Sequence, residues 1–300
     1  TEIVTYNDRI SIQHPLKTDF SAFIKAETFS NVLAKSSVSQ VALIRTENDL
    51  KIKAKGINVT LPTVMDDEII SRIKTVGVSL EGIEWKKLPE NFVECINLCS
   101  FAASKSESDS TMSCVHISDT LCIASDNNRI AKAELDTTME PMFIKASEIK
   151  SLVGVKPTSW GGSKSWLHFK NEAGCIFSLR RIDGSYPDFL QHFEFEGSRI
   201  NLPKDLTEGT DLATIFTEGT EQPSITVTIQ DSKCLLSVKS ESGGIKFLTA
   251  IDYTGKKLQF TINPDFLIEM MKYTTTIVLT EGKAKLETEN FSLLTSLYGE

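Results

Sequence analysis

The chain has 300 residues, which corresponds to about two domains of usual size and leaves room for three small ones. Its 32 Lys and Arg against 40 Asp and Glu give a net charge of −8, and 40% of the residues are hydrophobic. This balance excludes a protein that holds nucleic acid through its overall charge, because phosphate binding needs clustered Lys and Arg, although a local basic surface remains open.

Short helices and strands alternate along the chain, and one pattern comes three times. A helix predicted at 27–35 is followed by strand-like runs at 41–45 and 50–55 with a turn between them. The same order returns at 147–153, 166–170 and 175–180, and again at 264–273, 277–280 and 284–287. The chain therefore repeats one mixed unit of helix and strands.

Similar peptides accompany these elements at a nearly constant interval. Phe23-Ile24-Lys25-Ala26 recurs as Phe143-Ile144-Lys145-Ala146, 120 residues later, and more loosely as Phe260-Thr261-Ile262-Asn263, another 117 later. Asn7-Asp8-Arg9-Ile10 matches Asn127-Asn128-Arg129-Ile130, again 120 residues apart. This period predicts three domains, at 1–82, 83–195 and 196–300. The first is expected to be incomplete, because residue 1 aligns with residue 121.

The predicted strands alternate apolar and polar residues. Residues 50–55 and 224–229 both show this pattern, which is typical of an antiparallel sheet with one covered face. Parallel units would show continuous apolar strands and longer connecting helices. The sequence thus predicts an α+β fold, with antiparallel sheets on one side and pairs of helices on the other.

Three segments give the sequence a family resemblance. Ala124-Ser125-Asp126-Asn127-Asn128-Arg129-Ile130-Ala131 is similar to an Ala-Thr-Asp-Gly-His-Arg-Leu-Ala turn of the bacterial DNA polymerase III β sliding clamps. The run from Arg181 to Phe189, containing Gly184, Pro187 and Asp188, resembles the segment that closes the middle domain of that family. Asn263-Pro264-Asp265-Phe266-Leu267 resembles the start of its last helix. The resemblance covers essentially the whole chain and is that of a divergent member, such as a phage or plasmid version.

The sequence departs from the family pattern in three places. About 35 to 50 residues of the first domain have no counterpart, which indicates a truncated chain or a reduced first domain. The family's Met-Pro-Met-Arg-like tail appears as Leu294-Thr295-Ser296-Leu297, and the Arg beyond the Pro-Asp-Tyr run appears as Gln191, followed by His192.

The resemblance implies tandem clamp domains that close into a ring, with sheets outside and helices lining a central hole. Its partners would be duplex DNA, encircled without sequence preference, and a second copy of the chain. A homodimer is expected, with a trimer as the nearest alternative. The DNA-facing candidates, for which a solvated helix surface is the alternative, are Lys35, Lys105, Lys150, Lys204 and Lys272.

The family also implies a pocket between the middle and last domains that binds short linear peptides of DNA polymerase and clamp loader. Apolar walls would bury a Leu or Phe anchor, while Arg129 and Asn263 could bond to the peptide backbone. Core packing is the alternative for Ile130, Phe266 and Leu293. The matching positions are Ser125, Asn128, Arg129, Ile130, Pro187, His192, Asn263, Phe266, Leu293 and Leu294.

No catalytic or cofactor motif is found. The glycine pairs Gly161-Gly162 and Gly243-Gly244 are interpreted as turns, and Asp66-Asp67-Glu68 as the start of a helix. Trp160 and Trp166 flank a loop and could stack on a base, although a buried ring that holds the loop is the preferred interpretation. No enzyme activity, metal site or cofactor is predicted.

The cysteines indicate the compartment. The six of them contain no CxxC pair, and Cys95 and Cys99 fall on one face of a predicted helix, where core packing is expected. Buried thiols are typical of a reducing compartment, and no apolar run approaches the ~18 residues of a membrane span. The cytoplasm is therefore predicted.

Two other classes of function remain open at this stage. A non-enzymatic structural or interaction protein built from tandem α+β repeats, such as a virion component, would have a similar sequence pattern. It would not bind a peptide of the Gln-x-x-Leu-Phe type, which a clamp should bind weakly. An enzyme is the third alternative, and a turnover assay on nucleotides or DNA ends would test it.

Overall fold

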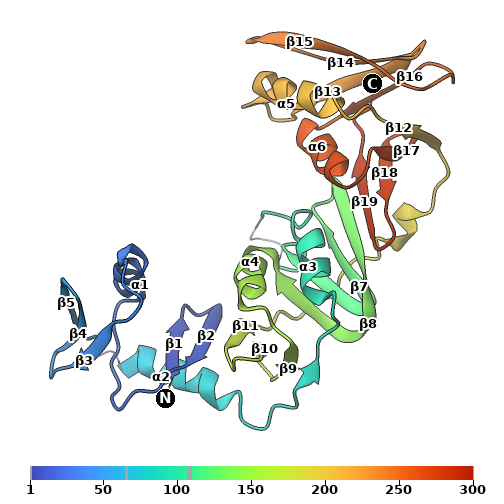
Figure 1. Ribbon diagram of the computed structural model, residues 1–300. Coiled ribbons are helices and arrows are strands. Elements are labelled where there is room, and N and C mark those ends of the chain that lie inside the picture. The colour runs from blue at the N-terminus through green and yellow to red at the C-terminus, as the bar shows by residue number, and fades with distance from the viewer. Residues whose placement is uncertain (1, 65–66, 107–109, 300) are drawn as a thin grey trace. The chain divides into compact units, whose positions relative to one another are not determined.

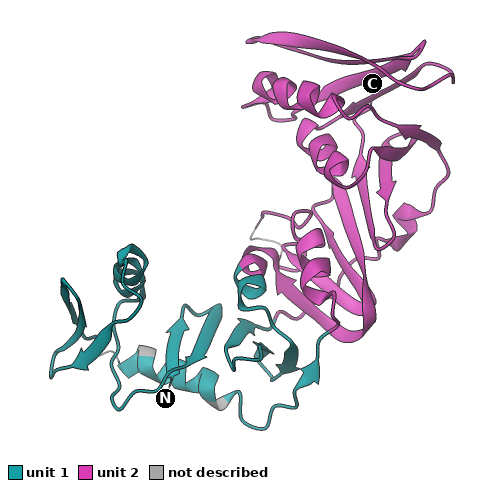
Figure 2. Cartoon of the chain, viewed as in Figure 1, with its two compact units in different colours: residues 1–88, 151–181 teal, residues 89–150, 182–300 magenta. Residues whose placement is uncertain are grey.

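The computed structural model describes residues 2–64, 67–106 and 110–299 (Figure 1). The chain forms two compact units, one of residues 1–88 and 151–181 and the other of residues 89–150 and 182–300 (Figure 2). Every strand pair among the described residues is antiparallel, which confirms the α+β prediction. The division into three domains remains a prediction.

The first unit holds two sheets. A six-stranded sheet has the order β1-β2-β11-β10-β9-β6, and a three-stranded sheet has the order β3-β4-β5. Its elements are β1 (Glu2–Tyr6), β2 (Ile10–Pro15), α1 (Ala26–Lys35), β3 (Ala42–Arg45), β4 (Asp49–Ala54), β5 (Ile57–Pro62), α2 (Asp67–Val78), β6 (Lys86–Lys87), β9 (Ser159–Gly162), β10 (Trp166–Lys170) and β11 (Ile176–Arg180).

The second unit also holds two sheets, with the orders β12-β17-β18-β19-β8-β7 and β15-β14-β13-β16. The boundary between the units passes through α4 (Ala146–Val155). The elements are α3 (Phe92–Ser100), β7 (Cys114–Ser125), β8 (Arg129–Lys145), the 3-10 helix η1 (Leu190–Phe193), β12 (Ser198–Asn201), α5 (Leu206–Thr217), β13 (Ile225–Gln230), β14 (Lys233–Ser240), β15 (Gly243–Ala250), β16 (Leu258–Ile262), α6 (Pro264–Tyr273), β17 (Thr276–Thr280), β18 (Lys283–Glu287) and β19 (Phe291–Ser296).

Local sequence explains these elements. In β4, Leu50 and Ile52 are buried while Lys53 is exposed, as the alternation predicts. Helix α6 begins after Asn263, whose side chain accepts a hydrogen bond from the backbone N of Asp265 at 2.9 Å, with Pro264 in the first turn. The predicted helices at 27–35, 147–153 and 264–273 are confirmed as α1, α4 and α6. Helix α5 packs on β14 and β15 and contacts α6.

Two turns that the sequence repeat matches have the same hydrogen bonds, but not in the predicted register. Asn7 Oδ1 accepts from the backbone N of Arg9 and Ile10, and Asp126 Oδ1 accepts from the N of Asn128 and Arg129. The following residues, Asp8 and Asn127, both have positive φ. Asn7 therefore corresponds to Asp126, one position away from the sequence match. The repeated Arg-Ile pair is thus shifted by one residue, which places its side chains on opposite faces of the two strands.

The two glycine pairs lie in strands, so their interpretation as turns is wrong. Gly161 and Gly162 belong to β9, and a Cβ at Gly161 would overlap the side chain of Ile83. Gly243 and Gly244 begin β15, where a Cβ at Gly244 would lie 2.5 Å from the Val238 carbonyl oxygen. In each pair one glycine, Gly161 or Gly244, allows a neighbouring part of the chain to approach closely.

The acidic run and the cysteines behave as the sequence indicates. Helix α2 begins at Asp67 with Glu68 in its first turn, whereas Asp66 lies outside the described residues. Cys95 and Cys99 are buried on α3, which confirms core packing. Trp160 and Trp166 are 6% and 2% exposed, so their rings are core groups and are not available to a base. Within the described ranges, no helix is both long and apolar enough to cross a membrane.

A buried histidine makes the stability of the first unit depend on pH. The fully buried ring of His168 lies between Ser178 Oγ, 2.8 Å from Nδ1, and Ser79 Oγ, 3.3 Å from Nε2. Burial lowers its pKa to about 4. The unfolded chain, with a pKa near 6.5, binds the proton more tightly, so stability is full above pH 6.5 and falls as pH drops toward 4.

We expect the free energy of unfolding of this unit to fall by about 3 kcal/mol between pH 7 and pH 4 because of His168. Urea unfolding of the chain across this pH range measures it. His168→Asn, which keeps a polar group of similar reach, should flatten the dependence. An equally steep dependence in that variant would contradict this assignment.

Candidate functional site

The turn between β7 and β8 is fixed by its own side chains. Ser125 is fully buried, and its Oγ accepts a hydrogen bond from the backbone N of Asn127 at 3.1 Å. Asp126 Oδ1 accepts from the N of Asn128 and Arg129 at 3.1 and 3.0 Å. The carbonyl oxygen of Asn128 in turn accepts from Ser296 of β19 at 2.7 Å. Two of the predicted residues, Ser125 and Asn128, therefore shape the turn through their backbone and buried atoms.

Arg129 is held on three sides. Its Nε donates to Asp126 Oδ2 at 2.9 Å, and its guanidinium lies 5.3 Å from the ring centre of Phe101 and 4.7 Å from that of Phe266. The side chain is 13% exposed. Charge and stacking thus connect β8 to α6 and to the turn after α3. The hydrogen bond to a peptide backbone that the family implies for Arg129 stays a prediction.

Strand register divides the predicted residues between the two faces of the sheet. Leu294 lies opposite Ile130, and Ile130 lies opposite Ser125, so these three side chains share one face. Leu293 and Arg129 alternate with them and lie on the other face, where Phe266 of α6 stacks on Arg129. Ile130, Leu293 and Leu294 are 6%, 1% and 5% exposed, and Phe266 is half-buried.

The face with Ile130 and Leu294 is covered by residues 186–195, which we call the cover segment. Phe193 is 7% exposed and forms one buried cluster with Ile123, Ile130 and Leu294. Tyr186, Phe189 and Phe195 pack against this cluster. The segment is therefore a row of aromatic rings on an aliphatic sheet face.

Two predicted residues belong to the cover segment. Pro187 is exposed, and His192 is half-buried with its ring centre 6.3 Å from that of Phe189. The structure thus brings Ile130, Leu294 and His192 together around one aromatic cluster, and Pro187 lies next to Tyr186 in the chain. Asn263 lies at the start of α6, where its side chain caps the helix.

The candidate DNA-facing lysines are all exposed. Lys35, Lys150 and Lys272 lie on α1, α4 and α6, whereas Lys105 follows α3 and Lys204 precedes α5. Lys272 is paired with Glu269 at 2.7 Å, which reduces its attraction for phosphate. Their orientation toward DNA is a prediction.

Several residues of the site were not predicted from the sequence. Asp126 lies inside the recognised turn but was given no role, and Phe193 and Phe195 follow the recognised run. Lys285 of β18 is 7% exposed, and its Nζ donates to the Phe193 carbonyl oxygen at 2.9 Å. A lysine in a strand is normally an outward-facing residue, so no local signal marks it.

The chemistry of the site is that of recognition. Rings, aliphatic chains and one arginine can hold apolar side chains and a peptide backbone. Burial raises the pKa of the thiol of Cys95 to about 12 and also raises that of Cys99, so neither is a nucleophile at neutral pH. Among the residues that the structure describes, no group of three or more His, Cys, Asp and Glu side chains is placed to hold a metal ion.

Comparisons with known proteins give a consistent result. No protein-family model matches the chain. A curated beta sliding clamp of Lactococcus lactis is 26% identical over 306 aligned positions, which cover 90% of this chain and 78% of the relative.

Solved structures match over the full length. The DNA polymerase III beta chain of Streptococcus pneumoniae has a TM-score of 0.82 at 19% identity, covering 100% of this chain and 89% of its own. A Bartonella birtlesii sliding clamp bound to griselimycin has a TM-score of 0.82 at 13% identity, with coverage of 100% and 88%. The Bacillus subtilis sliding clamp has a TM-score of 0.78 at 17% identity, with coverage of 100% and 88%.

Proposed function

Because the chain is a divergent member of the β sliding clamp family, we propose that it is a DNA sliding clamp. It would encircle duplex DNA as a processivity factor and tether the replicative polymerase through a peptide site. The observation that carries this proposal is the full-length match of the fold to bacterial clamps, together with the curated relative. The role is a non-enzymatic one, in the cytoplasm where the DNA lies.

The charge of the protein suits this mode of binding. A ring is retained on DNA by topology, so it needs no strong phosphate contacts, and strong contacts would slow its sliding. A net charge of −8 with scattered lysines satisfies that requirement. We propose that Lys35, Lys105, Lys150, Lys204 and Lys272 line the hole, and that domains 1–82, 83–195 and 196–300 follow one another around it.

Ring closure can be argued from strand pairing. Within the first unit β11 pairs with β2, and within the second β19 pairs with β8. By the same repeat, β5 and β15 are the strands left to pair with each other. They lie at the edges of the three-stranded and four-stranded sheets. We propose that β5 of one copy pairs with β15 of the next, which gives a head-to-tail contact able to close a ring.

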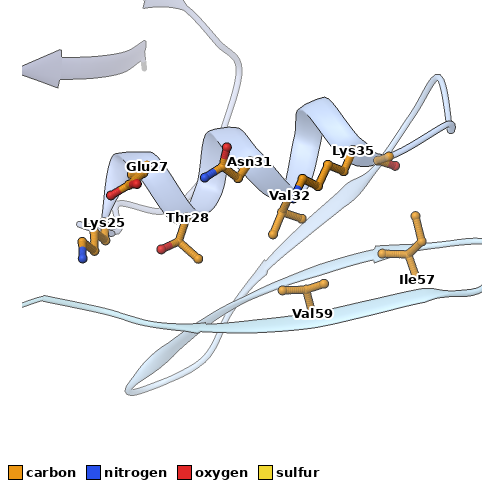
Figure 3. Close-up of a pocket in the computed structure, with 9 residues that line it drawn as sticks. Lys25, Glu27, Thr28, Asn31, Val32, Lys35, Ile57 and Val59 are labelled. Atoms are coloured by element: carbon orange, nitrogen blue, oxygen red, sulfur yellow. The ribbon is translucent and has the colours of Figure 1, made fainter.

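The helices beside these two edges have complementary surfaces. Beside β15, Ile215 and Leu212 of α5 are 61% and 43% exposed, and the acidic Asp211 and Glu218 flank them. Beside β5, α1 forms a groove in which Val32 points toward Ile57 and Val59, with Lys25 and Lys35 at the two ends of the helix (Figure 3). An acidic-edged apolar stripe would thus meet a groove whose rim carries two lysines and Glu27. Two such contacts give the homodimer, and three would give a trimer.

The peptide site would be the aromatic cluster under the cover segment. Its partners would be DNA polymerase and clamp loader, each through a short linear peptide with a Leu or Phe anchor. Burial of one anchor contributes about 1.5–3 kcal/mol, so two or three anchors give micromolar binding at best. Such binding suits partners that must exchange.

The experiment is retention on DNA of different topology. The full chain, with a bacterial clamp loader and ATP, should co-migrate with a nicked circular plasmid and leave it once the plasmid is cut to a linear form. Equal binding to both forms would indicate ordinary surface binding. A chain that stays monomeric and never co-migrates with circular DNA would contradict the proposed function.

A further inference from the structure

The lysine beneath the cover segment is unusual for its place in the fold. Lys285 lies in β18 directly opposite Leu294, which lies opposite Ile130. The three side chains therefore form one row across the same face of the sheet. Lys285 is 7% exposed, in a position where the neighbouring members of the row are apolar. A buried ammonium group must have partners that repay its loss of water.

Those partners come mainly from the cover segment. Nζ of Lys285 donates to the Phe193 carbonyl oxygen at 2.9 Å and lies 4.9 Å from the ring centre of Phe195. Its charge is balanced by Glu287 at 2.9 Å, a side chain that is half exposed. Glu287 neutralises the lysine, whereas the two phenylalanines define where its ammonium group lies.

The Phe193 carbonyl oxygen, which accepts this bond, lies at the C-terminal end of η1 within the cover segment. Phe193 is the last residue of η1, and its carbonyl oxygen also accepts from the backbone N of Phe195 at 3.1 Å. Carbonyl groups at the end of a helix need such donors, and a cation there is favourable. Lys285 thus holds the end of η1 by a hydrogen bond, whereas Lys132 and Lys283 lie over the rings of Phe193 and Phe195 at 5.4 and 6.0 Å.

We propose that Lys285 is a positioning residue of the peptide site: by holding the end of η1 on the sheet, it sets the aromatic wall against which a peptide anchor packs. This inference rests on the proposed function. Lys285 does not touch the peptide and acts through Phe193 and Phe195. When the wall of a binding site moves by about 1 Å, the site loses affinity even though all its residues are present.

Substitutions of Lys285 should change peptide affinity without a comparable change in the stability of the fold. Removing Lys285 leaves Glu287 half exposed and solvated, and the Phe193 carbonyl oxygen keeps its bond from the backbone N of Phe195, so little stability should be lost. Lys285→Met keeps the length of the side chain and removes only the donor and the charge. Lys285→Arg keeps both the hydrogen-bond donor and the positive charge. Glu287→Gln is the matched control, because it removes the charge partner and leaves the bond to Phe193.

The experiment is fluorescence anisotropy with a labelled peptide of the Gln-x-x-Leu-Phe type, together with the melting temperature of each variant. Lys285→Met should weaken binding at least about tenfold while Lys285→Arg and Glu287→Gln stay within about threefold of the parent chain. Because the remaining Glu287 is half exposed, the melting temperature of Lys285→Met should stay within about 3 °C of that of the parent.

Phe195→Leu gives a second reading if the methionine variant does not fold. It removes the ring over the ammonium group and should weaken peptide binding at least about threefold. Parent-like affinity in Phe195→Leu and in any folded Lys285→Met overturns the inference. Failure of the parent chain to bind the peptide at all would instead count against the proposed function, and with it the inference.

Discussion

Ile215→Glu is expected to convert the closed ring into single chains. Ile215 lies at the centre of the apolar stripe of α5 and is 61% exposed in the single chain. In the proposed contact it would be buried in the groove beside α1, and a glutamate there would have to lose its water without a partner. The dissociation constant between copies should rise at least about 100-fold, and sedimentation velocity at micromolar concentration measures it.

The matched control is Ile44→Glu. Ile44 is also an exposed isoleucine, at 41%, but it lies on β3, at the opposite edge of its sheet from β5. This variant should associate like the parent chain. If Ile215→Glu associates like the parent, or if Ile44→Glu dissociates as strongly, the contact between α5 and α1 is not the one that closes the ring.

Arg129→Ala should clearly destabilise the second unit. The substitution removes two ring contacts and leaves Asp126, whose side chain is 19% exposed, without its cation. The free energy of unfolding should fall by about 2–4 kcal/mol, since each ring contact contributes about 1 kcal/mol and a mostly buried ion pair leaves a costly single charge when broken. Urea unfolding at fixed protein concentration measures it.

Two further variants separate the causes of that loss. Arg199→Ala removes an exposed arginine of β12 in the same unit and should change stability by less than about 0.5 kcal/mol. Phe266→Leu removes only one of the two rings and should cost an intermediate amount. A loss in Arg129→Ala no greater than in Arg199→Ala would show that the stacked arrangement does not join α6 to β8.

Helices and strands were predicted best from the sequence where interactions between residues close in the chain define them. Asn263 and Pro264 mark the first turn of α6, and Trp166 to Lys170 form β10 within the predicted bounds. The alternation of Leu50, Lys51 and Ile52 likewise predicted which face of β4 is covered. These signals act over a few residues, so no knowledge of the tertiary structure is needed to interpret them.

Two features were predicted incorrectly from the sequence. The sequence match of Arg9-Ile10 to Arg129-Ile130 is wrong by one residue. Residue identity aligns Asn7 with Asn127, whereas the side-chain hydrogen bonds of the two turns align Asn7 with Asp126. The sequence around Gly161 resembles a turn because the neighbour that requires this glycine, Ile83, is far away in the sequence. The register is fixed by hydrogen bonds within each turn that residue identity does not show, whereas the glycine error came from packing against a residue distant in the sequence.

The turn of the candidate site could be predicted from the sequence, but the cover segment could not. The turn from Ser125 to Ile130 carries a recognisable motif, whereas Phe193, Phe195 and Lys285 acquire a role only when β18 lies beside β19. A lysine in a short strand gives the same pattern whether it faces water or a carbonyl group. Only the register across the sheet reveals that Lys285, Leu294 and Ile130 share one face.

Electron microscopy of the purified chain tests the proposed encirclement of DNA most directly. Particles should be closed rings of two copies, or of three, whose central opening admits duplex DNA, and added nicked circular DNA with clamp loader should appear threaded through them. Particles without an opening, or copies joined into open filaments, would contradict it.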